Sequence, residues 1–328
     1  MILVTGATGH LGNVLVRKLV TQGLDVRAMV LPNDPGTAIE GLPIERVDGN
    51  VLEPETLDRA MENVDTVYHL AGIISIVPGA EKLMRRVNIE GVRNVANAAL
   101  RSGVDRLVHV SSIHAFQRLP AGTVVDECTP LALDHPAGAY DETKARGTVA
   151  LLDAVKAGLD AVIACPTGIV GPYDHLGSEM GATILNFAKR KLHLLVQGAY
   201  DFVDVRDVVE GLLLARDNGR VGEIYILSGH YVTIPQLKEL VQRIAGVHSG
   251  HVILPEQIAM TFAQLMQHVY RMTRIIPRFT PYSLHTIFEN ARFTCAKAQE
   301  QLGYSPRPLV ETIRDTLQWR QAVPQPNH

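Results

Sequence analysis

The sequence contains few cysteines, and they form no recognisable arrangement. Its 328 residues include three, Cys128, Cys165 and Cys295, which lie far apart along the chain. An odd number of widely separated cysteines gives neither a disulfide framework nor the spacing of a metal site. We therefore expect no metal centre and a reducing compartment, by default the cytoplasm.

An excess of charge and long apolar runs are also missing. The net charge is −3, and the lysines and arginines are scattered, apart from a triplet at 189–191 that is expected to mark a helix end. No apolar run approaches the length of a membrane span, and the first residues indicate a strand and a glycine turn rather than a signal peptide. The sequence therefore predicts a small-molecule substrate as partner, with no nucleic acid and no integral membrane segment.

Short apolar runs alternate with longer helical patterns through the first half of the chain. Strands are expected at 2–5, 25–30, 44–47, 65–72, 106–112 and 160–166, and helices at 10–22, 54–63, 81–103 and 140–157. This alternation indicates parallel strands joined by crossover helices, and unbroken apolar runs indicate strands buried on both faces. The predicted fold class is α/β, a Rossmann-type doubly wound parallel sheet.

The alternation weakens after Pro166, where the pattern becomes helical and looped. We expect a dinucleotide-binding Rossmann domain at 1–170, to which 197–228 returns. A smaller, mostly helical C-terminal substrate-binding lobe would be formed by 171–196 and 229–328, over the sheet edge where ligands bind.

One expected helix of this lobe, at 255–279, carries an apolar stripe at helical spacing. The stripe consists of Ile258, Phe262, Leu265, Met266, Val269 and Met272. Packing into the core is the favoured interpretation, while a wall for a lipophilic substrate and a membrane-facing surface are alternatives. The sequence leaves all three open.

The segment VTGATGHLG at 4–12 predicts a dinucleotide site. It follows a strand, opens a helix and holds Gly6, Gly9 and Gly12 at a GxxGxxG spacing. Gly6 permits the sharp turn, Gly9 lets the backbone approach a pyrophosphate, and Gly12 allows the helix to pack closely on the strand. The helix N-terminus then offers free N–H groups and the positive end of its dipole to the phosphates.

The end of the second strand indicates which nicotinamide cofactor binds. An acidic residue there would bind the ribose 2′-hydroxyl of NAD, whereas an arginine would accept the 2′-phosphate of NADP. Leu31 stands at this position, and Asn33 and Asp34 follow slightly late. Without a well-placed arginine, the predicted cofactor is NAD or NADP, with NAD favoured.

Three residues form a candidate catalytic group. Ser112 ends the fifth expected strand, and Tyr140 and Lys144 stand one helical turn apart in the segment YDETK. A tyrosine with a pKa of about 10 is a poor base at neutral pH, but a neighbouring ammonium and a positive nicotinamide would lower that pKa. The phenol can then exchange a proton with a carbonyl or alcohol oxygen that the serine hydroxyl holds in place. Residues 141–143 are expected to be the rest of an ordinary helical turn.

These motifs resemble the extended short-chain dehydrogenase/reductases, also known as the NAD-dependent epimerase/dehydratase family. The resemblance covers nearly the whole chain and rests on TGATGHLG, VDGNVLEP, HLAG, VNIEGVRNV, HVSSIHAF, YDETKARG, CPTGIVGP and FVDVRDVVEG. It implies that Ser112 is catalytic, that Tyr140 is the acid/base, and that Lys144 lowers the pKa of the tyrosine and binds the nicotinamide ribose. It also implies that Asn88 steadies its helix or a proton-relay water, and that a homodimer forms through the helices at 81–103 and 140–157.

The predicted cofactor site extends over several turns. Asn50 and Val51 would hold the adenine edge, although Asn50 departs from the aspartate usual in the family, so we expect weaker binding there. The resemblance also implies that Pro166 to Ile169 pass beside the nicotinamide. The full predicted set is Gly6, Thr8, Gly9, His10, Leu11, Gly12, Leu31, Asn50, Val51, Leu70, Ala71, Gly72, Tyr140, Lys144, Pro166, Thr167 and Ile169.

The residues after Ser112 indicate the type of reaction. Dehydratases of this family carry an acidic pair there, whereas this chain has Ile113 and His114. The segment is similar to dihydroflavonol-reductase-like and 3β-hydroxysteroid-dehydrogenase-like members, which implies hydride transfer between nicotinamide and a carbonyl or secondary alcohol of a small, lipophilic substrate. A sugar-nucleotide epimerase is the alternative, followed by a non-catalytic dinucleotide-sensing regulator. The candidate substrate residues are Ile113, His114, Tyr173 and Met180.

Overall fold

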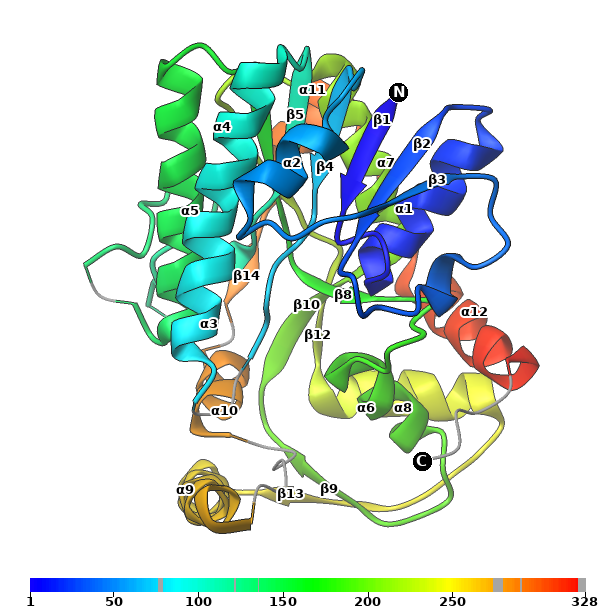
Figure 1. The fold of residues 1–328 in the computed structure, drawn as a ribbon. Helices are drawn as coiled ribbons and strands as arrows, with labels where there is room; N and C mark the ends of the chain where they lie inside the picture. Colours follow the sequence, from blue (N-terminus) through cyan, green and yellow to red (C-terminus); the bar gives the residue numbers. More distant parts are fainter. Residues whose placement is uncertain (76–78, 121, 135, 274–279, 290, 324–328) are drawn as a thin grey trace.

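A seven-stranded parallel sheet forms the centre of the molecule (Figure 1). The computed structural model describes residues 1–75, 79–120, 122–134, 136–273, 280–289 and 291–323. In spatial order the strands are β11 (Ile224–Leu227), β7 (Ala161–Pro166), β5 (Arg106–Val110), β4 (Thr66–His69), β1 (Ile2–Thr5), β2 (Val26–Val30) and β3 (Glu45–Asp48). Each neighbouring pair is parallel, which confirms the predicted sheet.

Helices cover both faces of this sheet, so it is doubly wound as predicted. One face carries α1 (His10–Thr21), α7 (Val205–Asn218) and α11 (Ala296–Leu302), and the other carries α2 (Pro54–Ala60), α4 (Val92–Ser102) and α5 (Ala139–Lys156). In β1, Ile2 and Val4 enter the first core and Leu3 enters the second, because successive side chains of a strand point to opposite faces. Burial on both faces explains why the strands are unbroken apolar runs in the sequence.

The long helix predicted to precede β5 contains a π-helical turn. α3 (Glu81–Arg85) leads into the π segment Arg86–Gly91, which continues into α4. Asn88 lies in this segment and is buried, and its amide bonds the backbone of Ile73 and a hydroxyl of α5. The regular helix predicted here was therefore wrong in detail, since apolar periodicity carries little signal for a single widened turn.

The remaining segments form a smaller lobe along the carboxyl edge of the sheet (Figure 1). Its helices are α6 (Glu179–Phe187), α8 (Ile234–Ala245), α9 (Glu256–Thr273), α10 (Pro281–Phe288) and α12 (Leu309–Ala322). In its three-stranded sheet, β10 (Ala199–Asp204) lies between β12 (His230–Thr233) and β8 (Gly168–Val170). Two smaller sheets pair β13 (His251–Leu254) with β9 (His193–Val196), and β14 (Arg292–Phe293) with β6 (Val124–Val125). Two apolar clusters separate from the main cores stabilise this lobe.

One segment that the sequence assigned to the lobe packs with the sheet. Cys295, Ala298 and Leu302 belong to the core between the sheet and α7. The hydroxyl of Tyr304 donates a hydrogen bond of 3.2 Å to the carbonyl of Ser228, just after β11. The division of the chain into two domains stays a prediction, and this segment is a further return to the sheet.

Candidate active site

The turns that follow six parallel strands meet at one edge of the sheet. They are the turns after β1, β2, β3, β4, β5 and β7. Because these strands all end on the same side, most of the predicted cofactor and catalytic residues share this edge. The lobe lies along the same edge, so a ligand there would have protein on both sides (Figure 1).

The loop between β1 and α1 has the close backbone contacts of a dinucleotide loop. Gly6 has a φ of 68°, and a Cβ atom on it would lie 2.8 Å from the backbone nitrogen of Ala71. A Cβ atom on Gly12 would lie 2.0 Å from the carbonyl oxygen of Gly6, so only glycine lets α1 start this close to β1. α1 begins at His10 directly after Gly9, and its first turn, which is fully described, contains no acidic residue. This helix end fits the pyrophosphate of a dinucleotide.

Hydrogen bonds fix the neighbouring loops against this glycine loop. The hydroxyl of Thr8 donates to the carboxylate of Asp34 at 2.6 Å. The Nε2 atom of His10 lies 2.9 Å from the carbonyl oxygen of Pro172, and Leu11 packs against the main core. The glycine loop is therefore held by the loops after β2 and β8.

The end of β2 carries both a carboxylate and a guanidinium. Leu31 is 55% exposed, as befits a residue that could touch a ligand. Asp34 follows it and is held beside the glycine loop by Thr8. Arg46, on β3, places its guanidinium 3.4 Å from the carbonyl oxygens of Asp34 and Pro35. The sequence did not single out Arg46, because it approaches from a different strand.

The predicted adenine residues are engaged with their own turn. The side-chain oxygen of Asn50 accepts a hydrogen bond from the backbone N–H of Leu52 at 3.0 Å, and its amide donates to Glu53 at 3.1 Å. Val51 is buried, and its carbonyl accepts a hydrogen bond of 3.0 Å from Asn94. The Asn50 side chain therefore shapes the turn after β3.

The turn after β4 lies beside the catalytic helix. The backbone N–H of Ala71 donates to the hydroxyl of Thr5 at 3.2 Å, and Leu70 packs against the main core. A Cβ atom on Gly72 would lie 3.4 Å from both the Nζ atom of Lys144 and the side-chain oxygen of Asn88. This turn thus joins the predicted cofactor edge to the predicted catalytic residues.

The turn after β7 completes the edge. Pro166 ends the buried strand β7, and Ile169 packs partly against the main core. Thr167 is buried and donates a hydrogen bond of 2.6 Å to Asp201, which also accepts from the backbone of Gly229. The backbone that was predicted to pass the nicotinamide is therefore firmly held.

Ser112, Tyr140 and Lys144 come together between β5 and the first turn of α5. All three are buried. The Ser112 hydroxyl faces the Tyr140 phenol closely enough to lower the pKa of that phenol. The Ser112 oxygen also accepts a hydrogen bond of 3.2 Å from the backbone N–H of His114, at the start of a short 3-10 helix, Ile113–Ala115. The serine is thereby oriented towards the phenol.

The electrostatics of this group differ from the expectation. Burial raises the pKa of Tyr140 to about 12, and the hydrogen bond with Ser112 opposes this only in part. Burial lowers the pKa of Lys144 to about 8. Its Nζ atom donates to the carbonyl of Val110 at 3.2 Å. In the protein by itself the pKa of Tyr140 is therefore above its usual value, because burial and the nearby negative charge of Asp141 together outweigh the hydrogen bond with Ser112.

Asp141 is a buried carboxylate of this site that sequence reasoning missed. It is 2% exposed, although it was expected to belong to an ordinary helical turn. Its carboxylate accepts a hydrogen bond from the hydroxyl of Tyr282, lies 3.2 Å from Nδ1 of His114, and pairs with the Arg118 guanidinium at 3.2 Å. Burial would raise the pKa of Asp141, but the bonds from His114 and Tyr282 and the charge of Arg118 outweigh it and hold the pKa below its usual value.

The two residues after Asp141 are not ordinary helix surface either. Thr143 is fully buried, and its hydroxyl donates to the carbonyl of Tyr140 at 3.0 Å and accepts from Asn88 at 3.1 Å. Glu142 pairs with Arg85 at 2.5 Å and with an arginine of its own helix. The only signal in the sequence was a polar residue beside the tyrosine, and such residues are usually solvated.

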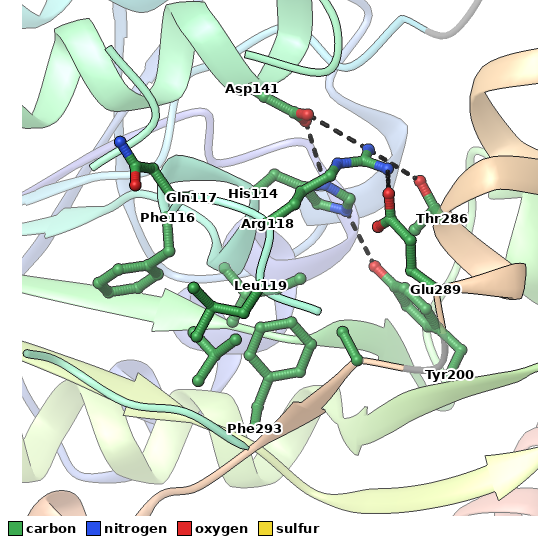
Figure 2. Close-up of a pocket in the computed structure, with 13 residues that line it drawn as sticks. His114, Phe116, Gln117, Arg118, Leu119, Asp141, Tyr200, Thr286, Glu289 and Phe293 are labelled. Carbon is green, nitrogen blue, oxygen red and sulfur yellow. Dashed lines mark hydrogen bonds and ion pairs between the residues drawn. The ribbon is translucent and has the colours of Figure 1, made fainter. Parts of the chain in front are cut away.

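His114 connects Asp141 to Tyr200, as Figure 2 shows. A carboxylate only accepts hydrogen bonds, so Asp141 favours the tautomer with its proton on Nδ1 of His114. The Nε2 atom is then free to accept the hydrogen bond from the hydroxyl of Tyr200, at 3.0 Å. The imidazole ring lies 5.5 Å from the Tyr140 ring, centroid to centroid.

A pocket opens next to this network, between the loop after β5 and α10. Figure 2 shows a polar wall, formed by His114, Asp141, Arg118, Tyr200 and Glu289, facing apolar side chains. The apolar residues include Phe116, Leu119, Val125 and Phe293. The pocket therefore combines polar and apolar side chains, but its volume of about 30 Å³ is far below that of a site for a drug-sized ligand.

Two of the four predicted substrate residues line this pocket, namely Ile113 and His114. Tyr173 lies on the cofactor side, where its ring is tilted against that of Trp319 and its carbonyl accepts a hydrogen bond of 3.2 Å from Asn13. Met180 packs against the apolar cluster of the lobe. The four residues are therefore distributed over three places.

Comparison with known proteins agrees with this geometry. The sterol demethylase protein B of Methylococcus capsulatus is 35% identical over 97% of this chain and 97% of its own length. A 4-hydroxy-2-methyl-3-oxo-4-farnesyl-3,4-dihydroquinoline-1-oxide ketoreductase of Stigmatella aurantiaca is 28% identical over 98% of this chain and 96% of its own.

Solved structures share the whole fold. The crystal structure of gox2253 matches with a TM-score of 0.85 and 32% identity over 98% of both chains. The dTDP-glucose 4,6-dehydratase DesIV of Streptomyces venezuelae, solved with NAD bound, matches over 98% of this chain and 97% of its own with a TM-score of 0.78, but its 21% identity shows the fold alone. A family model for the NAD dependent epimerase/dehydratase family matches residues 2–228. The chain therefore belongs to the NAD dependent epimerase/dehydratase family, as its motifs indicated.

Proposed function

We propose that this protein is an NAD(P)-dependent oxidoreductase that transfers a hydride between nicotinamide and a carbonyl or secondary alcohol of a small, lipophilic substrate. The observation that carries the proposal is the meeting of Ser112, Tyr140 and Lys144 at the sheet edge that also holds the glycine loop. A nicotinamide cofactor, when bound, supplies or takes the hydride. The protein's own groups move the proton and hold the substrate oxygen.

The raised pKa of Tyr140 keeps its phenol in the protonated form, which is the form that acts as a general acid. With a pKa of about 12, the phenol is protonated at neutral pH and can donate its proton to a carbonyl oxygen. Ser112 hydrogen-bonds the same phenol and would hold that oxygen beside it. Lys144 lies close enough to the turn after β4 to bind the ribose of the cofactor.

The apolar composition of the pocket, rather than its volume, supports a lipophilic substrate. Phe116, Leu119 and Phe293 would contact its body, while Ile113 and His114 lie next to the reacting group. The names of two relatives point the same way, since one is a sterol demethylase protein and the other a ketoreductase of a farnesylated quinoline. We therefore propose a ketone on a terpenoid or steroid-like skeleton.

NAD remains the favoured cofactor. The carboxylate of Asp34, held by Thr8, would repel a 2′-phosphate, whereas Arg46 would attract one. We expect kcat/KM to be higher with NADH than with NADPH, and Leu31→Arg to reverse the order. A wild-type enzyme that already prefers NADPH would contradict this choice.

A sugar-nucleotide epimerase is the alternative, since several solved structures of the same fold are epimerases. Such an enzyme would keep NAD bound between turnovers and would accept UDP- or dTDP-sugars. Acid release of NAD from the purified protein, together with sugar-nucleotide turnover, would favour it over the reductase.

The decisive experiment compares wild type with Tyr140→Phe in a screen that follows nicotinamide absorbance. Steroid and flavonoid ketones, aldehydes and sugar nucleotides would each be tested with NADH and NADPH. Loss of general acid catalysis should lower kcat by about 10²–10⁴. Tyr231→Phe, on β12, is the matched control and should keep the wild-type rate. An unchanged rate in Tyr140→Phe would remove this residue from the mechanism.

Cofactor binding can be measured separately through the single tryptophan. Trp319 packs against Tyr173 and His175, in the loop that contacts His10 of the glycine loop. Its fluorescence should therefore respond when NADH binds, and Tyr140→Phe should retain this response. If the folded protein shows neither a fluorescence change with NADH nor turnover, both the reductase and the dinucleotide-sensing regulator are excluded.

We also propose a cytoplasmic homodimer that forms through α4 and α5, as in related enzymes of the family. The two helices pack side by side on one face of the sheet, with part of each exposed to solvent. Sedimentation at micromolar concentration should give twice the mass of 35.9 kDa. A monomer under these conditions would contradict the proposal.

A further inference from the structure

The small sheet of β9 and β13 has one open face that is apolar. Leu194 pairs in register with Val252, so their side chains lie together on one side, and Leu192 precedes by two residues on that same side. The neighbouring residues of β9, His193 and Leu195, point the other way and are buried. The open face therefore exposes three aliphatic side chains, each 46–65% exposed in the described part of the chain.

Helix α9 extends this apolar region. It packs through Ala259 and Ala263 against Val196 and Leu254, which lie at the ends of β9 and β13 on the same side as the open face. Next to this buried stripe, α9 exposes Ile258, Phe262 and Leu265. We call the six residues Leu192, Leu194, Val252, Ile258, Phe262 and Leu265 the distal surface, and each is between 46% and 65% exposed. The elements that carry it, β9, β13 and α9, lie at the end of the molecule away from the parallel sheet (Figure 1).

The charges beside the distal surface have one dominant sign. Lys189, Arg190 and Lys191 are all exposed and lead directly into Leu192. Glu256 is the one acidic residue in the segments 188–197 and 247–266. A cluster of bases beside apolar side chains is the combination that binds anionic lipid, since each base near the membrane adds about 1 kcal/mol of attraction.

We propose that the distal surface docks on an anionic lipid bilayer, with the bases at 189–191 on the headgroups and the apolar side chains in the interface. No helix among the described residues combines the length and apolar character needed to cross a bilayer, so the contact would be peripheral. Apolar surface of this kind is unfavourable in water and calls for a partner. The inference does not depend on which substrate the active site takes.

Vesicle sedimentation tests the proposal with the full chain. The protein should sediment with vesicles of phosphatidylcholine containing about a third phosphatidylserine, and less with phosphatidylcholine alone. Raising the salt from 50 to about 500 mM should weaken the anionic component, because exposed charges are screened. If equally little protein sediments with both vesicle types, no more than sediments without vesicles, the proposal is overturned.

Two sets of variants locate the contact. Leu194→Ser/Phe262→Ser should lower the partition coefficient at least about tenfold, since two apolar side chains leave the interface. Arg190→Glu/Lys191→Glu should remove the preference for anionic vesicles. The matched controls are Val221→Ser, which is half exposed before β11, and Lys156→Glu at the end of α5, both on the opposite edge.

Thermal melting and gel filtration accompany these measurements. Unchanged melting in the variants would show that binding was lost without unfolding. If Leu194→Ser/Phe262→Ser instead breaks an oligomer while the wild type ignores vesicles, the distal surface is a contact between copies of the chain and the membrane proposal is wrong. Equal loss of vesicle binding in the control variants would also contradict it.

Discussion

Helices α5 and α9 both have eighteen residues, yet they treat their side chains in opposite ways. The first turns of α5 bury the ionisable side chains of Tyr140, Asp141 and Lys144, at 2–8% exposure. In contrast, α9 leaves Phe262 and Leu265 more than half exposed. Helix α5 buries polar side chains, whereas α9 exposes apolar side chains to solvent.

Both arrangements cost stability when they are considered alone. A buried charge loses its hydration unless partners replace it, and an exposed aromatic ring loses the gain of burial. Natural proteins keep such features where function needs them. In α5 the partners belong to the protein itself, through Arg118 and His114. In α9 we infer that the partner lies outside the protein.

The largest effect on stability is expected when the buried carboxylate of Asp141 is removed. Asp141→Ala should lower the free energy of unfolding by about 3 kcal/mol, because it deprives Arg118 and Tyr282 of their buried acceptor. Asp153→Ala, on the exposed side of the same helix, should cost about 0.5 kcal/mol or less. Urea unfolding measures the free energy of unfolding of both variants. Equal losses would show that the buried contacts of Asp141 do not stabilise the protein more than those of a surface carboxylate.

Replacing the buried ammonium should act in the opposite direction. The pKa of Lys144 is lowered to about 8, so below pH 8 the folded state bears the full cost of a protonated, buried lysine. Lys144→Met removes that cost but also the hydrogen bond to Val110, so we expect a gain of about 1–2 kcal/mol at pH 7.

The pH dependence of this gain identifies its cause. Between pH 8 and about 10.5 the folded wild type releases the proton while the unfolded chain keeps it, so wild-type stability rises relative to the variant. The gap should therefore shrink across this window and change little below it. Lys156→Met, whose side chain is 77% exposed in the wild type, is the control and should show no such trend. A gap of constant size from pH 7 to 10.5 would exclude the buried charge as its source.

The smallest effect is expected on α9. Phe262→Ser should change the free energy of unfolding by about 0.5 kcal/mol or less, because the ring is already exposed. Leu284→Ala, in the cluster that α9 covers, should cost about 2–4 kcal/mol. Thermal unfolding distinguishes the two. A large loss in Phe262→Ser would mean that the ring packs against the protein, and the comparison with α5 would fail.

Local patterns predicted the parallel sheet and the family, and they gave candidate site residues. The glycine loop could be predicted from the sequence because Gly6 and Gly12 stand where a side chain would collide with nearby backbone. Tyr140 and Lys144 could be predicted as a pair because residues one helical turn apart lie on the same face of a helix. The candidate substrate residues were less well defined, since Tyr173 and Met180 lie in different parts of the fold from His114.

The role of Asp141 could not be read in the same way. Its partners come from a loop 23 residues before it and a helix 141 residues after it, and only folding brings them together. The sequence predicted the apolar stripe of α9 from its helical spacing. The structure describes the side chains of this stripe up to Met266 and that of Val269, which is half-buried. The side chain of Met272 and residues 274–279 lie outside the described part. Which side of the stripe is covered depended on where the helix docked.

The sequence by itself determined the elements whose geometry is local: the glycine turn, the strand–helix alternation and the YDETK turn. The tertiary structure decided which side chains lose water. Burial raises the pKa of Tyr140, lowers that of Lys144, and turns Asp141 from a surface acid into a link between α5 and α10. The physical reason is that desolvation depends on every segment that packs around a group, and most of those segments are distant in the chain.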